Sequence, residues 1–96
     1  MTIFLLERTN HYGNDKDSII AASDDMEVIL ERMEDDKGRE LQFWCDIKKR
    51  LTLMNTGKRE FEEVYYVTEW SESGDKLQRQ EIDRIIFYKR EKQLRK

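Results

Sequence analysis

The sequence predicts an α+β fold: a small, mainly antiparallel sheet of about four strands, with two helices inserted after the second strand. Two kinds of pattern predict this class. Short segments rich in β-branched and aromatic residues, bounded by polar turns, indicate strands, whereas apolar residues that recur every three or four positions indicate helices. Because 96 residues can form one hydrophobic core but not two, we predict a single domain over residues 1–96.

Four segments are predicted as strands. The first covers residues 2–8 and the second residues 17–22, with a turn-rich loop between them. Residues 60–70 form the third strand, and a turn at residues 71–75 follows it. The last segment, residues 82–88, could be a helix or a strand. We predict a strand, because its apolar side chains would scatter around a helical wheel.

The first helix is predicted to begin at residues 23–25. The side chains of this Ser-Asp-Asp segment can accept hydrogen bonds from the free amides of a first helical turn, and Asp24 and Glu27 have capping-box spacing. Apolar residues between positions 26 and 33 then repeat at helical intervals. The helix is expected to fade at residues 36–38.

A second helical pattern runs from about residue 39 to residue 55. Leu41, Trp44, Ile47 and Leu51 lie on one apolar stripe of it. Gly38 could separate two helices or only weaken one long helix, and the sequence leaves both possibilities open. We predict two helices.

Charge is distributed unevenly along the chain. Of the net charge of −3, residues 89–96 contribute five basic and one acidic side chain, so the rest of the chain is acidic. A typical nucleic-acid binder instead has a basic face and a high pI. We predict that residues 89–96 form a basic, mobile tail that could still make a local contact.

The sequence also indicates a location. No apolar segment approaches the roughly 20 residues that a membrane span needs, and the first residues lack the pattern of a secretory leader. The one cysteine, Cys45, cannot close a disulfide within the chain, which fits a reducing compartment. We expect a cytoplasmic protein, with Cys45 packed in or near the core.

No motif of catalysis or metal binding is recognisable. His11 has no partner to orient it as a general base, and residues 14–17 lack the spacing of a calcium loop. Asp46, Lys48 and the Glu62-Glu63 pair could be assigned to a metal-dependent nuclease, but a chain this rich in charge yields such pairs by chance. We predict no catalytic residue, no cofactor, no metal and no enzymatic activity.

Two features indicate a surface for a protein partner. Carboxylates at helical spacing on the first helix could imitate DNA phosphates, although a solvated helix face is the simpler interpretation. Aromatic residues on the 60–70 strand could anchor an interface. The residues that we predict to contact a partner are Asp24, Asp25, Glu27, Glu31, Glu34, Tyr66 and Trp70.

The strands predict apolar side chains on both faces of the sheet. Each strand has adjacent apolar residues and not strict alternation. If both helices cover one face, the other needs a cover, which could be the long loop, the tail or a second copy of the chain. We therefore expect that the protein could form a homodimer through its sheet.

Half of the chain resembles a group of known proteins. Residues 3–7, residues 18–23 followed by an acidic capped helix, and the Tyr-Tyr-Val-Thr-Glu-Trp segment at 65–70 are similar to small uncharacterised proteins of phage and bacterial genomes. The chain departs from their pattern in the segment 39–55 and after Trp70. The resemblance implies a fold and a phage or mobile-element origin, and it implies no active-site residue.

These observations predict a small non-enzymatic protein-binding module, a phage-encoded accessory protein or anti-defence inhibitor that occludes a host protein. An alternative is a nucleic-acid-associated regulator that uses the basic C-terminal tail. The third hypothesis is the metal-dependent nuclease.

Overall fold

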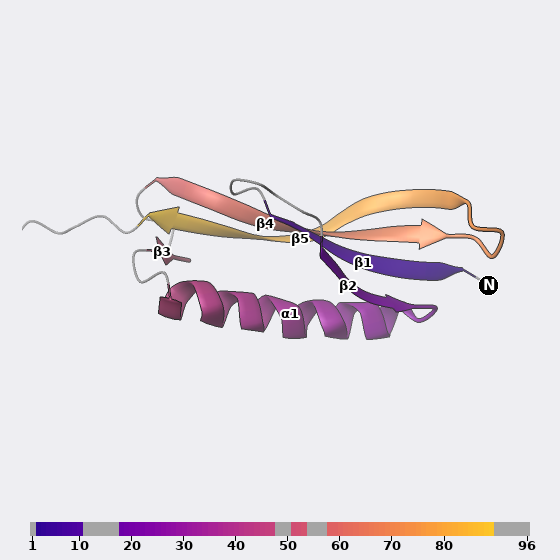
Figure 1. The fold of residues 1–96 in the computed structure, drawn as a ribbon, viewed down its shortest axis with the longest axis horizontal. Helices are drawn as coiled ribbons and strands as arrows, with labels where there is room; N and C mark the ends of the chain where they lie inside the picture. Colours follow the sequence, from indigo (N-terminus) through magenta and orange to yellow (C-terminus); the bar gives the residue numbers. More distant parts are fainter. Residues whose placement is uncertain (1, 11–17, 48–50, 54–57, 90–96) are drawn as a thin grey trace, which may run out of the picture.

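A computed structural model describes residues 2–10, 18–47, 51–53 and 58–89 of the chain. Within this part, five strands and one helix follow one another (Figure 1). In chain order they are β1 (Ile3–Asn10), β2 (Ser18–Ser23), α1 (Met26–Ile47), β3 (Leu51–Thr52), β4 (Arg59–Trp70) and β5 (Lys76–Lys89).

All strand pairs in the sheet are antiparallel, and the strand order is β2-β1-β4-β5-β3. The central strand β4 pairs with β1 from Trp70 to Glu63 on one side and with β5 along nearly its whole length on the other. α1 lies along one face of this elongated sheet (Figure 1). The predicted α+β class and the four long antiparallel strands are therefore confirmed, and β3 adds a two-residue strand at one edge.

The prediction of two helices is wrong. α1 is a single helix of 22 residues that continues through Gly38, and residues 39–47 form its last turns. The remainder of the predicted second helix contains β3. Gly38 weakens a helix by about 1 kcal/mol relative to alanine. Asp36 and Lys37, directly before it, bind side chains of the sheet, and these contacts outweigh that local penalty.

The start of α1 confirms the predicted capping segment but moves the cap by one residue. The Asp25 carboxylate accepts a hydrogen bond from the Glu27 backbone N–H at 2.9 Å, and the Ser23 hydroxyl accepts one from the Asp25 N–H at 3.1 Å. Asp25 therefore caps α1, where the capping-box spacing had indicated Asp24.

The β4–β5 hairpin confirms the predicted turn at residues 71–75. The Ser71 N–H donates to the Asp75 carbonyl at 2.9 Å, and the Gly74 N–H donates to the Ser71 carbonyl at 3.0 Å. Gly74 has a φ of 86°, a conformation that glycine adopts without strain. The following segment is a strand, as predicted, but β5 begins at Lys76, six residues before the predicted start at residue 82.

The hydrophobic core lies between α1 and the sheet. Its aromatic part is formed by Trp44 of α1 against Phe61 of β4, with ring centroids 4.7 Å apart, and by Phe61 stacked on Phe87 of β5 at 4.7 Å. The buried residues of this core are Leu6, Ile29, Met33, Leu51, Phe61, Tyr65, Val67, Ile85 and Phe87.

The sheet face that points away from α1 mixes charged and apolar side chains. Arg84 pairs with Glu62 at 3.2 Å and with Glu81, and the Arg79 guanidinium lies 4.0 Å from the centre of the Tyr66 ring. The buried Val64 and the half-buried Tyr66 and Trp70 also lie on this face, which therefore carries apolar side chains as well. The homodimer itself stays an untested prediction.

Candidate functional site

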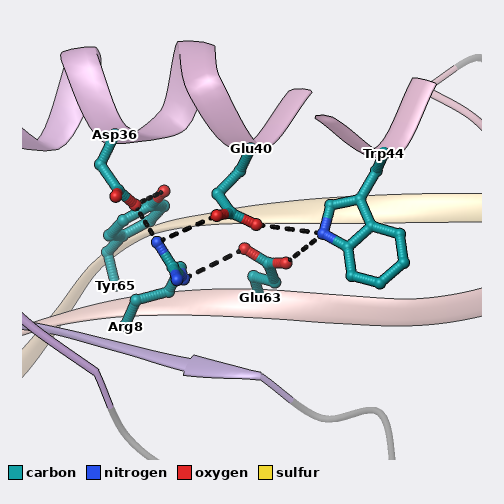
Figure 2. Close-up of polar contacts among 6 residues, drawn as sticks. All are labelled: Arg8, Asp36, Glu40, Trp44, Glu63 and Tyr65. Carbon is teal, nitrogen blue, oxygen red and sulfur yellow. Dashed lines mark hydrogen bonds and ion pairs between the residues drawn. The ribbon is translucent and has the colours of Figure 1, made fainter. Parts of the chain in front are cut away.

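The face of α1 that contacts the sheet changes character along its length. Ile29 and Met33 are buried apolar residues in its first half. The same stripe continues at helical intervals through Asp36, Glu40 and Trp44, whose side chains also point at the sheet (Figure 2). The second half of the helix is therefore docked through polar groups together with Trp44 and Leu41, which pack against the core.

Arg8 of β1 is the cation of this polar layer. Its guanidinium donates a hydrogen bond to the Asp36 carboxylate and forms ion pairs with Glu40 and Glu63, each at 3.3 Å (Figure 2). Burial alone would lower the pKa of Arg8, but the Asp36, Glu40 and Glu63 carboxylates raise it above its ordinary value. Arg8 therefore stays charged and joins β1, β4 and α1.

Tyr65 of β4 completes the contact with Asp36. Its buried hydroxyl donates a hydrogen bond of 2.7 Å to the Asp36 carboxylate. Burial, together with the Asp36 carboxylate, raises the pKa of the Tyr65 hydroxyl well above its usual range. Tyr65 therefore acts as a fixed neutral donor.

Glu63 is the most buried carboxyl group of the layer, with an exposure of 0%. Its Oε1 accepts a hydrogen bond of 2.8 Å from the Trp44 indole N–H, which also donates to Glu40 at 3.0 Å. Burial raises the pKa of Glu63 to about 8, and Glu40 adds to the rise, while Arg8 and Trp44 act in the opposite direction. Burial therefore favours the protonated form of Glu63.

We call these six residues the Arg8 cluster: Arg8, Asp36, Glu40, Trp44, Glu63 and Tyr65. A protonated carboxyl beside a carboxylate is a common arrangement for acid–base catalysis. Here Glu63 and Tyr65 are both fully buried, so a substrate could not reach them while α1 is docked. The cluster instead holds α1 on the two strands β1 and β4 of the sheet.

The three carboxylates of the cluster do not form a metal centre. No group of three or more His, Cys, Asp or Glu side chains in the described ranges is arranged to hold a metal ion. Arg8 lies among the carboxylates instead and provides the positive charge that a metal would supply.

The predicted acidic residues lie where the sequence placed them. Asp24, Asp25, Glu27, Glu31 and Glu34 are all exposed. Between residues 24 and 35 the chain has six carboxylates and one arginine. Asp36, which directly follows this acidic segment in the sequence, instead faces the sheet and binds Arg8.

The predicted aromatic residues Tyr66 and Trp70 lie on a different surface. Phe61, Glu63 and Tyr65 contact α1, so the strand alternation turns Tyr66 and Trp70 to the opposite face of the sheet. The structure therefore does not bring them together with the acidic residues of α1. Both are half-buried, and Tyr66 is covered by Arg79.

Several other candidates are only partly described. His11, the segment 14–17, Lys48 and residues 90–96 of the basic tail lie outside the described residues. Cys45 is a free, half-buried thiol. No helix among the described residues has the length and apolar character needed to span a membrane.

No protein-family model, no curated protein and no solved structure matches the chain. The resemblance to small phage and bacterial proteins therefore stays a prediction, and the function is argued from the chain itself.

Sequence reasoning missed the Arg8 cluster, although two signals indicate it. The stripe Ile29, Met33 continues at helical spacing to Asp36 and Glu40. On the strand, Glu63 occupies the inward position between Phe61 and Tyr65. Charged residues at inward positions of two elements that pack together predict a buried ionic contact.

Proposed function

We propose that this protein is a small non-enzymatic binding module that presents the outward face of α1 to a basic surface of a partner protein. In this proposal it is a phage-encoded accessory or anti-defence protein, acting in the cytoplasm of a bacterial host. It inhibits by occupying a basic groove. The proposal rests on the charges of one helix face.

The observation that carries the proposal is a contrast between two sets of carboxylates. On and beside the sheet, Glu62 pairs with Arg84 at 3.2 Å and Asp83 pairs with Lys37 at 2.7 Å. Within the part of the chain that the structure describes, Glu27, Glu31 and Glu34 form no ion pair. The exposed face of α1 therefore holds negative charge that the fold itself does not compensate.

This face is unfavourable for the isolated helix. Glu31 lies four residues from Glu27, three from Glu34 and four from Asp35. Like charges at these spacings destabilise a helix by roughly 0.2–0.5 kcal/mol per pair. A basic partner surface would remove this repulsion and would gain long-range electrostatic attraction during association.

Tyr66 and Trp70 are assigned no role at this surface, because they face away from α1. They stay predicted contacts for a second surface on the other side of the sheet.

The test is affinity purification from a bacterial lysate treated with nuclease. We compare the wild-type protein with the triple variant Glu27→Gln, Glu31→Gln, Glu34→Gln. A matched control, Glu60→Gln, Glu72→Gln, Glu81→Gln, changes the net charge equally at exposed positions outside α1. The proposal predicts one protein captured at near-equal stoichiometry by wild type and control but not by the triple variant.

Two results would contradict the proposal. Equal capture by the triple variant would place the binding surface elsewhere. Capture only from a parallel lysate that is not treated with nuclease would favour the nucleic-acid-associated regulator, whose binding should weaken steeply as salt is raised.

A further inference from the structure

The Arg8 cluster contains more negative than positive groups. Asp36, Glu40 and Glu63 surround one guanidinium in a layer where Glu63 is fully buried. If all three carboxyls were ionised, two negative charges would remain uncompensated between helix and sheet. Burying uncompensated charge is strongly unfavourable.

The hydrogen bonds of the cluster indicate which carboxyl groups would bind a proton and so reduce this excess of negative charge. Asp36 accepts hydrogen bonds from Arg8 and Tyr65, so it is well satisfied as a carboxylate. Glu40 and Glu63 instead converge on one donor, the Trp44 indole N–H, at 3.0 and 2.8 Å. The buried Oε2 of Glu63 has no hydrogen-bond partner among the described residues and lies 3.3 Å from the Arg8 Nε.

We propose that Glu40 and Glu63 share one proton when α1 is docked, and that losing this proton as the pH rises releases the second half of α1 from the sheet. With the proton present, Glu63 can donate to the Glu40 carboxylate and the cluster holds two negative charges against one positive charge. When the proton passes to solvent, two carboxylates that share a single N–H donor repel each other in a buried site.

No other charged group of the described chain is positioned to compensate this loss. The facing residue on β5, Ile85, is apolar. Arg84, next to Ile85, lies on the opposite face of the sheet with Glu62. On the face of β5 toward α1 the nearest charged residue is Asp83, two positions along, and Lys37 of α1 is already bound to it at 2.7 Å. β1 contributes Arg8 and β4 contributes Tyr65, whose hydroxyl is committed to Asp36.

The two halves of α1 differ in what holds them. The first half is docked by apolar residues that do not titrate, including Ile29 and Met33. The second half is held by the Arg8 cluster, by the Lys37–Asp83 ion pair and by Leu41, which packs against the core. Its release would expose the aromatic surface of Phe61 and Phe87. Since the pKa of Glu63 lies at about 8, release would begin just above neutral pH. This inference does not depend on the proposed binding role.

The test is amide hydrogen exchange of the whole chain at about pH 6 and about pH 9, expressed as protection relative to an unstructured chain at the same pH. We expect protection of residues 36–47 to fall at least about tenfold, the change produced by about one pH unit beyond the pKa. Protection of residues 26–33 should change less. Glu63→Gln should abolish the fall, and Glu62→Gln, a neighbouring change on the other sheet face, should leave it intact.

Glu40→Gln provides a second variant in case Glu63→Gln does not fold. It also leaves two carboxylates against one guanidinium, so residues 36–47 should stay protected at high pH. The proposal is overturned if the wild-type protection is equal at both pH values, or if the folded Glu63→Gln or Glu40→Gln variant loses protection as the wild type does.

Discussion

Arg8 carries the largest single electrostatic role in the described chain. Its side chain is only 16% exposed, and it contacts three carboxylates on α1 and β4. A buried charge left without its partner destabilises a protein far more than the intact pair stabilises it. The sequence did not predict this role, because an arginine at the end of an apolar strand looks like an ordinary surface residue.

Replacing Arg8 with leucine should lower the free energy of unfolding by about 3–5 kcal/mol, because three carboxyl groups then lack their cation. Urea denaturation measures this change. Arg84→Leu is the matched control, since its ion pairs lie on the exposed sheet face and should contribute much less to stability. An equal decrease of the unfolding free energy in Arg8→Leu and Arg84→Leu would contradict the role assigned to Arg8.

Glu63 makes global stability depend on pH. Its pKa of about 8 in the folded protein lies above the ordinary value of 4.5. Between these two values the folded state holds a proton that the unfolded chain has released, so the unfolding free energy falls as the pH rises. The slope from this group can reach about 1.4 kcal/mol per pH unit.

Urea midpoints measured across this window should therefore decrease toward alkaline pH in the wild type and stay nearly level in Glu63→Gln. Asp83, whose pKa is lowered by Lys37 and by the Arg84 backbone although burial opposes this, acts only at lower pH. Its contribution is lost as the pH falls through the acidic range. A wild-type midpoint that rises between pH 5 and 8 would show that Glu63 is not protonated in the folded state.

At the scale of elements, sequence patterns predicted the strands and turns better than the helix. The 71–75 turn and β4 follow from local chemistry, namely a glycine with positive φ and a run of β-branched and aromatic residues. Gly38 misled the prediction, because the contacts that carry the helix past it come from β1 and β5. Such long-range contacts leave no local signal around a glycine.

Gly38→Ala should raise the unfolding free energy by about 1 kcal/mol, because alanine favours the helix and the added Cβ meets no atom within 4 Å. Gly74→Ala is the contrasting change. A Cβ added at Gly74 also meets no atom within 4 Å. However, the backbone φ of 86° at this position is unfavourable for alanine by roughly 1 kcal/mol or more. Thermal unfolding of the two variants should give shifts of opposite sign, and destabilisation by Gly38→Ala would argue against a continuous α1.

The cap of α1 gives a second comparison between neighbouring residues. Asp25→Ala removes the acceptor of the Glu27 N–H and should lower stability by about 1 kcal/mol. Asp24→Ala should have a smaller effect, because Asp24 makes none of the hydrogen bonds at the helix start. If Asp24→Ala lowered the stability more than Asp25→Ala does, the helix cap would be Asp24, as the capping-box spacing had indicated.

At the scale of the molecule, α1 separates two kinds of charge. Its inner face holds carboxylates that are paired with Arg8, and its outer face holds carboxylates that form no ion pair with a described cation. We therefore propose that the carboxylates on the exposed face of α1 serve to bind a partner and are not needed for the fold.

The measurement that tests this claim most directly is the unfolding free energy of Glu31→Gln at low and high salt. Gln and Glu have similar helix propensities, so the change mainly removes the repulsion from Glu27, Glu34 and Asp35. We predict that the variant is more stable than the wild type by about 1 kcal/mol at low salt, and that the difference nearly disappears in about 1 M salt. A variant less stable than the wild type would show that the fold needs this charge, and would contradict the claim.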